Sequence, residues 1–126
     1  SKEEMILHSE RVYNFERVFN LRMGKGTRAD HNIPDRALGP VFEDEWNARP
    51  EYFDGKLSEA GISPEGLPLK EKMTKLLEFR RSEWEKLVDA VYKRRGWNAN
   101  GVPKLETLKR LGIDFPEVVD VVKAHQ

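Results

Sequence analysis

The chain has 126 residues, of which 38% are hydrophobic and 35% charged, and its 22 basic residues balance its 22 acidic ones. This length suits one domain and is too short for a cofactor domain followed by a substrate domain. Zero net charge argues against nonspecific attraction to nucleic acid or to an anionic membrane. The absence of cysteine excludes disulfides, thiol catalysis and cysteine-ligated zinc or iron–sulfur centres within these residues.

No segment approaches the roughly 20 consecutive apolar residues that a membrane span requires. The start, SKEEMILHSE, lacks a secretory pattern. We therefore expect a cytoplasmic protein that does not enter a membrane. The first residue is Ser rather than Met, which is consistent with a piece of a longer protein.

The first element in chain order is a predicted long helix from about Lys2 to Met23. This stretch contains no Pro or Gly, and its apolar residues recur at three- and four-residue steps. Gly24 and Gly26 supply the open backbone that ends it.

This helix has an unusual polarity, because polar residues are spread around a helix whose other positions are bulky and apolar. The polar residues are Arg11, Asn14, Arg17, Asn20 and Arg22, and the apolar ones are Val12, Tyr13, Phe15, Val18 and Phe19. We expect such a helix to lie inside a larger body that hydrogen-bonds its guanidinium and amide groups, which an isolated helical hairpin could hardly do. An isolated chain is then expected to leave part of its apolar or polar surface exposed.

The middle of the chain predicts less regular structure. Residues 25–40 read as an ordered excursion, and residues 41–57, interrupted by Pro50 and Gly55, as one or two short helical turns. The run GISPEGLP is a compact linker whose Pro68 opens the next helix. We treat residues 37–68 as an insert or linker region.

Leu69 to Arg95 is the clearest helix, with an apolar stripe at helical spacing, basic residues in its last turn and Gly96 after it. We expect a short helix from Pro103 to Gly112 and a last one from Pro116 to about Lys123. No period-two alternation is visible. The sequence therefore predicts an all-α fold, an irregular helical domain over residues 1–126 with two long helices and several short ones.

Candidate catalytic and metal-binding residues are few. His8, His31 and His125 are too dispersed for a metal set. Asp30 and His31, with Asp35 nearby, could orient an imidazole for acid–base work, but a solvated turn is the better interpretation.

Two anion-binding patterns also have simpler interpretations. Gly24 and Gly26 before Thr27 and Arg28 could cradle a phosphate, but no strand precedes them and a helix terminus explains them. The basic run at 93–95 with Trp97 resembles a nucleic-acid patch, but a helix end and a packed Trp suffice. We predict no catalytic, cofactor-binding or metal-binding residue in this chain.

Two motifs nevertheless resemble a known family. ERVYNFERVFNLRMG followed by TRADHNIPDR, and then YKRRGWNANGVPKLETLKRLGI, are similar to the carboxyl-terminal end of the tungsten-containing aldehyde ferredoxin oxidoreductases. The family patterns fall on the following residues: Glu10, Arg11, Asn14, Glu16, Arg17, Phe19, Asn20, Arg22, Gly24, Arg28, Asp30, His31, Pro34 and Arg36, then Tyr92, Arg95, Gly96, Trp97, Gly101, Pro103, Leu108, Leu111 and Gly112.

The resemblance covers about 50 of the 126 residues, at both ends of the chain. Between them, family members usually have a short connection, whereas residues 37–66 here form a longer insert that contains Trp46, Tyr52 and Phe53. This departure leaves the subfamily and the substrate open.

The resemblance implies a parent enzyme that oxidises aldehydes to carboxylic acids at a tungsten or molybdenum bis-pterin centre. Electrons would leave through a 4Fe-4S cluster to ferredoxin. The family's cluster cysteines and pterin contacts lie upstream of this helix, so no catalytic residue is carried over. The resemblance implies a scaffold role, with the upstream domains of the same enzyme as partners and oligomer formation possible.

Two other functions compete with this interpretation. A helical protein–protein interaction module without redox function would use the apolar helix to dock on a partner. A helix-turn-helix DNA-binding protein would use the two short helices near the end of the chain, but zero net charge weighs against it.

Overall fold

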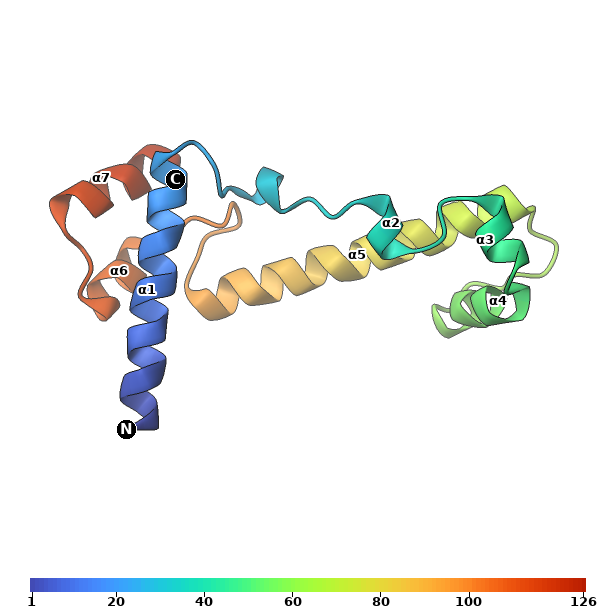
Figure 1. Cartoon of the computed structure of the whole chain (residues 1–126), viewed down its shortest axis with the longest axis horizontal. Coiled ribbons are helices and arrows are strands. Elements are labelled where there is room, and N and C mark those ends of the chain that lie inside the picture. Colours follow the sequence, from blue (N-terminus) through green and yellow to red (C-terminus); the bar gives the residue numbers. More distant parts are fainter. The chain divides into compact units, whose positions relative to one another are not determined.

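The computed structural model describes all residues, 1–126, and contains helices and no strand (Figure 1). Trp97 and Pro103 form an isolated antiparallel bridge. The helices are α1 (Lys2–Arg22), the 3₁₀ helix η1 (Arg28–His31), α2 (Asp35–Leu38), α3 (Glu43–Asn47), α4 (Pro50–Glu59), α5 (Leu69–Arg95), α6 (Leu105–Leu111) and α7 (Pro116–His125). The all-α prediction is confirmed. None of the helices combines the length and apolar character needed to cross a membrane.

The chain divides into two compact units. Unit 1 contains residues 1–32 and 88–126, and unit 2 contains residues 33–87. Helix α5 begins in unit 2 and ends in unit 1. Each unit has its own apolar core, so the two are described separately, and the single domain over residues 1–126 stays a prediction.

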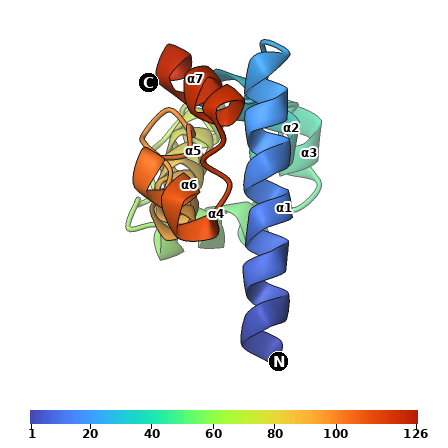
Figure 2. The same cartoon turned by 90° about the vertical axis from the view of Figure 1, so that its left-hand side faces the viewer.

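In unit 1, α1 packs against α6 and α7 (Figure 2). The core brings α1 together with the last quarter of the chain. Its buried residues are Val18, Leu21, Val102, Leu108, Leu111, Ile113, Val118 and Val122. This core holds the amino-terminal helix against segments that lie about one hundred positions away in sequence.

Local chemistry fixes both ends of α1. Ser1 and Glu4 form a reciprocal capping box at its start. The helix ends at Arg22, one residue before the predicted end, and Gly24 follows with φ of +78°. The predicted long helix is therefore confirmed.

In unit 2, α3, α4 and the first part of α5 enclose a smaller core of Trp46, Leu57 and Leu76. The Trp46 indole N–H donates to Asp54 Oδ1 at 3.3 Å, and Lys72 Nζ lies 2.9 Å from Asp54 Oδ2. The Asp54 carboxylate at the edge of this core therefore has both of its partners within unit 2.

Three further helices differ from the sequence prediction. Helix α4 runs for 10 residues with Pro50 in its first turn and Gly55 inside it, so neither residue interrupts a helix there. Helix α6 begins at Leu105, because Pro103 is held in extended backbone by its bridge to Trp97. Helix α7 continues to His125, two residues beyond the predicted end. Helix α5 has the predicted bounds.

Candidate functional site: the polar network of unit 1

Arg17 is the centre of a polar network that joins α1 to η1, to the end of α5 and to the following turn. Its side chain is only 6% exposed. Its Nε donates to the carbonyl of Gly101 at 2.8 Å, and its guanidinium lies 4.5 Å from the centre of the Trp97 ring. Burial lowers the pKa of Arg17 from its ordinary value, although a guanidinium remains charged near neutral pH.

His31 connects Arg17 to the last turn of α5. Its Nε2 lies 2.7 Å from Arg17 Nη1, and its Nδ1 contacts the Tyr92 hydroxyl. Because a guanidinium can only donate, Nε2 accepts, so the ring is neutral and Nδ1–H donates to Tyr92 Oη. Burial, and then the charge of Arg17, lowers the pKa of His31 from its ordinary value.

Gly101 provides the space that this arrangement needs. Its φ is +76°, and a Cβ atom there would lie 2.3 Å from Arg17 Nη2 and 2.8 Å from Tyr92 Cζ. Arg17 Nη2 is buried without a hydrogen-bond partner. The backbone of Gly101 therefore packs closely against this nitrogen.

Trp97 forms the second half of the network. It is 4% exposed, and its indole N–H donates to Asn14 Oδ1 at 2.7 Å. Asn14 Nδ2 in turn donates to the carbonyl of Glu10 at 2.9 Å. Tyr13 stacks on Trp97 with ring centres 5.9 Å apart, and the Arg95 guanidinium lies 3.7 Å from the centre of the Tyr13 ring.

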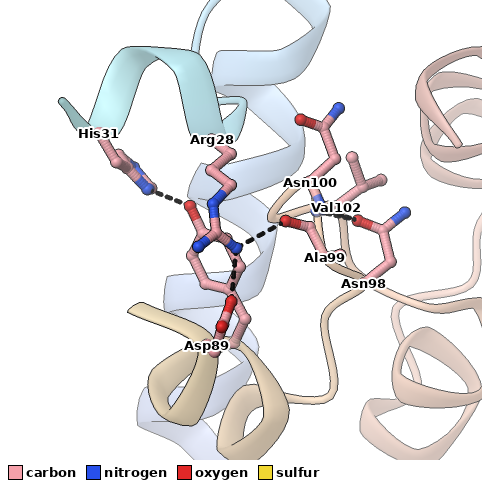
Figure 3. Close-up of polar contacts among 8 residues, drawn as sticks. Arg28, His31, Asp89, Asn98, Ala99, Asn100 and Val102 are labelled. Atoms are coloured by element: carbon pink, nitrogen blue, oxygen red, sulfur yellow. Dashed lines mark hydrogen bonds and ion pairs between the residues drawn. The ribbon is translucent and has the colours of Figure 1, made fainter. Parts of the chain in front are cut away.

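Arg28 hydrogen-bonds η1 to the end of α5 and to the turn that follows it (Figure 3). Its Nη1 donates to Asp89 Oδ1 at 2.6 Å and to the carbonyl of Ala99 at 3.1 Å, and its backbone N–H donates to Asn100. Asn98 Oδ1 accepts from two backbone N–H groups of the same turn. The first sequence motif and the second therefore contact each other directly.

A carboxylate of this chain accepts hydrogen bonds from the glycine loop before η1. Asp30 Oδ2 accepts hydrogen bonds from the backbone N–H groups of Gly26, at 2.6 Å, and Thr27, at 3.1 Å. These are the groups that a phosphate would use. Because the carboxylate already fills the loop, the phosphate hypothesis receives no support.

The acid–base hypothesis for the histidine also receives no support. Both ring nitrogens of His31 are engaged by Arg17 and Tyr92, so Asp30 does not orient the ring. Asp35 lies in unit 2, where it pairs with Arg81. The interpretation of His31 as part of a solvated turn was wrong, because the ring is half-buried in the network.

The prediction for the polar residues of α1 was wrong in one respect. Arg11 Nε donates to the carbonyl of Leu111 at 2.7 Å, and the side chains of Asn14 and Arg17 are bonded to Trp97 and Gly101. These partners belong to this chain itself. Sequence reasoning missed them because each pair is separated by more than eighty positions.

The prediction for the apolar surface of α1 is confirmed. Val12 is 59% exposed, Phe15 49% and Phe19 57%, and Met5 and Met23 are more exposed still. None of these side chains takes part in the hydrogen bonds of the network. Helix α1 therefore leaves much of its apolar surface exposed, although Asn14 and the Nε of Arg17 are hydrogen-bonded within the chain.

The network joins α1, η1 and the end of α5 through hydrogen bonds and ring contacts. The chain has no group of three or more His, Asp or Glu side chains that could hold a metal ion. The buried Trp97 cannot stack on a nucleic-acid base, which removes the aromatic part of the nucleic-acid pattern.

Comparison with known proteins identifies a family whose model matches this chain. No curated protein and no solved structure matches the chain. The family model described as "Aldehyde ferredoxin oxidoreductase, domains 2 & 3" matches residues 1–113, which include every residue of the network and residues 37–68. Because the match extends over most of the sequence, as the two motifs indicated, the chain belongs to the aldehyde ferredoxin oxidoreductase family.

Proposed function

We propose that the chain is the carboxyl-terminal helical scaffold of a tungstopterin aldehyde ferredoxin oxidoreductase and is catalytically silent by itself. The parent enzyme would oxidise aldehydes to carboxylic acids and pass electrons through a 4Fe-4S cluster to ferredoxin. The upstream domains of the same enzyme would be the direct partners of the chain, and residues 1–126 would form one domain within it.

The observation that carries this proposal is the contrast on α1. Its buried polar side chains, Asn14 and Arg17, are hydrogen-bonded within the chain, whereas Val12, Phe15 and Phe19 remain about half exposed or more. A large exposed apolar face is typical of a surface that another domain covers. Together with the family match over residues 1–113, this face favours a part that supports an enzyme.

The cofactors of the parent do not fit the residues of this chain. A 4Fe-4S cluster requires cysteine thiolates, and the sequence contains no cysteine. The chain also has no cluster of His, Asp or Glu side chains that could ligate a metal. The proposal therefore assigns the tungsten (or molybdenum) bis-pterin and the cluster to the upstream domains, and no catalytic step to this chain.

Elemental analysis of the purified, untagged chain tests this assignment. The expected result is neither tungsten, molybdenum nor iron above trace level. Co-expression with the upstream domains of a family member should then give a complex that carries these metals and reduces a dye with aldehyde as the donor. Stoichiometric metal in the chain alone would contradict the proposal.

The exposed apolar face also favours a second candidate, a helical interaction module without redox function. The two candidates differ in the partner that they require. Stable capture of an unrelated protein by the chain, with no affinity for oxidoreductase domains, would favour the interaction module.

A further inference from the structure

Unit 1 carries an open groove of about 680 Å³ between the first half of α1 and the last turns of α5. Its apolar lining residues, which we call the floor, are Met5, Ile6, Tyr13 and Val91, and we call its charged lining residues the rim. All four side chains are exposed, from 38% for Val91 to 72% for Met5. The groove is therefore an apolar surface that nothing in this chain covers.

The rim of this groove is basic and its cations are not neutralised. Lys2, Arg94 and Arg95 line it, and none of them forms an ion pair with a carboxylate. The acidic residue of the rim, Glu10, is already paired with Arg110 at 2.8 Å. Unpaired cations around an apolar floor fit an occupant that is both acidic and apolar.

Arg95 is held in a position suited to receive a carboxylate. Its guanidinium stacks on Tyr13 at 3.7 Å from the ring centre and lies 5.6 Å from the centre of Trp97. Stacking uses the face of the guanidinium and leaves its edge N–H groups available, and this edge matches a carboxylate in a bidentate pair. Because Trp97 is hydrogen-bonded to Asn14, the network also fixes the position of the Arg95 guanidinium that packs near it.

We propose that this groove docks an acidic amphipathic helix from the upstream domains of the same oxidoreductase. The apolar side of that helix covers the floor, and its carboxylates pair with Arg94 and Arg95. A free phosphate would use the cations and leave the floor exposed, whereas an acidic helix uses both. This inference rests on the proposed function, because it names the part of the enzyme that meets the scaffold and the surface that receives it.

A second apolar groove in unit 1 has no excess of either charge. It has a volume of about 290 Å³ and lies between α1 and α7, where Phe15, Phe19 and Phe115 are exposed. Its rim has one cation, Arg22, and one anion, Glu117. With a neutral rim it does not indicate the charge of an occupant, so the inference concerns the basic groove alone.

Binding of the whole chain to the separately expressed upstream domains, followed by biolayer interferometry, tests the inference. Arg94→Glu reverses a charge on the rim, and Ile6→Glu introduces a charge into the apolar floor. Each substitution should weaken binding by about tenfold or more. The matched control is Lys93→Glu, which reverses the neighbouring charge outside the groove and should change affinity by less than about threefold. Arg95→Lys, which keeps the charge and loses the planar fork, should weaken binding by an intermediate amount.

Salt provides a second readout, because a merely structural variant would not change the salt dependence. Affinity of the unchanged chain should fall as salt rises, and this dependence should be reduced in Arg94→Glu. Arg94 and Ile6 are exposed, so their replacement leaves the core unchanged, which far-UV circular dichroism checks.

The outcomes separate the inference from the proposed function. If the unchanged chain binds the upstream domains and Arg94→Glu binds equally well, the groove assignment is overturned and the scaffold role stands. If the unchanged chain does not bind them, both are overturned. If Arg94→Glu instead abolishes self-association in sedimentation experiments, the groove belongs to a second copy and the inference is wrong.

Discussion

Units 1 and 2 are stabilised in different ways. All three buried polar residues of the chain, Asn14, Arg17 and Thr107, lie in unit 1, and the first two bond to groups more than eighty positions away in sequence. Thr107 Oγ1 donates to the carbonyl of Gly96, which joins the start of α6 to the turn after α5. Unit 2 buries three apolar side chains in its core, and its ion pairs lie at the edge or on the surface.

This difference shows that specific hydrogen bonds matter most in unit 1, whereas the volume of the core side chains matters most in unit 2. In unit 1 the native arrangement depends on individual donors, acceptors and contact distances, because an unpaired buried polar group is costly. In unit 2 it depends chiefly on the volume of a small core. The predictions below test this comparison in order of decreasing effect.

The largest effect is expected for Trp46→Ala in unit 2. Removing this indole from a core of three buried residues should cost about 4 kcal/mol of unfolding free energy. In hydrogen exchange, residues 33–87 should lose protection while α1, α6 and α7 keep theirs. Phe42→Ala, at an exposed neighbouring aromatic residue, is the control and should have little effect. Equal loss of protection in α1 would show that the two units do not differ as described.

Gly101→Ala in unit 1 should come next, at about 2–3 kcal/mol, from left-handed backbone and from collision with Arg17 and Tyr92. Urea unfolding measures the change. Gly24→Ala is a matched control, since its φ of +78° is similar and no atom lies within 4 Å of a Cβ there. The control should show only the backbone cost, about 1 kcal/mol. Equal costs would mean that close packing around Arg17 does not matter.

Trp97→Phe should cost about 1–2 kcal/mol because it leaves Asn14 Oδ1 buried without its donor. A double-mutant cycle with Asn14→Leu checks the reason. Asn14→Leu should cost less in the Trp97→Phe chain than in the unchanged chain. Additive costs would indicate that ring volume alone, and not the hydrogen bond, accounts for the loss.

The smallest effect concerns pH. The pKa of His31 in the folded chain lies below its ordinary value of 6.5, so the unfolded chain binds the proton more readily. The stability that depends on neutral His31 is therefore fully present above pH 6.5 and is lost as the pH falls through the folded pKa. Unfolding free energies measured between pH 8 and pH 5 should fall in this way, and His31→Gln should reduce the fall.

Unit 2 provides the contrast for this titration. The pKa of Glu45 is lowered from its ordinary value of 4.5, chiefly by the backbone N–H of Phe42 and then by that of Val41. This carboxylate is therefore ionised throughout the range from pH 5 to pH 8. Glu45→Gln should therefore leave the change between pH 8 and pH 5 unaltered. An unchanged pH dependence in His31→Gln would assign the titration to another group.

Local signals predicted the long helices well. Helix α5 has the predicted bounds because Pro68 precedes it, and Lys93, Arg94, Arg95 and Gly96 give its end both the charges and the backbone that stop a helix. Gly96, with φ of +70°, adopts the conformation that this prediction requires. Pro50 was misread because proline interrupts a helix in the middle and favours one in the first turn.

The network could not be predicted in the same way. The sequence shows that Arg17 and Asn14 need partners, but the partners are a backbone carbonyl at Gly101 and an indole at Trp97. Nothing local in sequence links them. The two motifs that carry the family resemblance were the available signal, since they are the two segments that the fold brings together.

The division of unit 1 into two sequence segments has a consequence for synthesis on the ribosome. Translation delivers α1 first, but its carbonyl and indole partners and the leucines of α6 are delivered in the last quarter of the chain. Unit 2, at residues 33–87, has all its contacts available earlier. All of unit 2 is therefore synthesised before the core partners of α1 at residues 102–122, and α1 remains without these partners until they emerge.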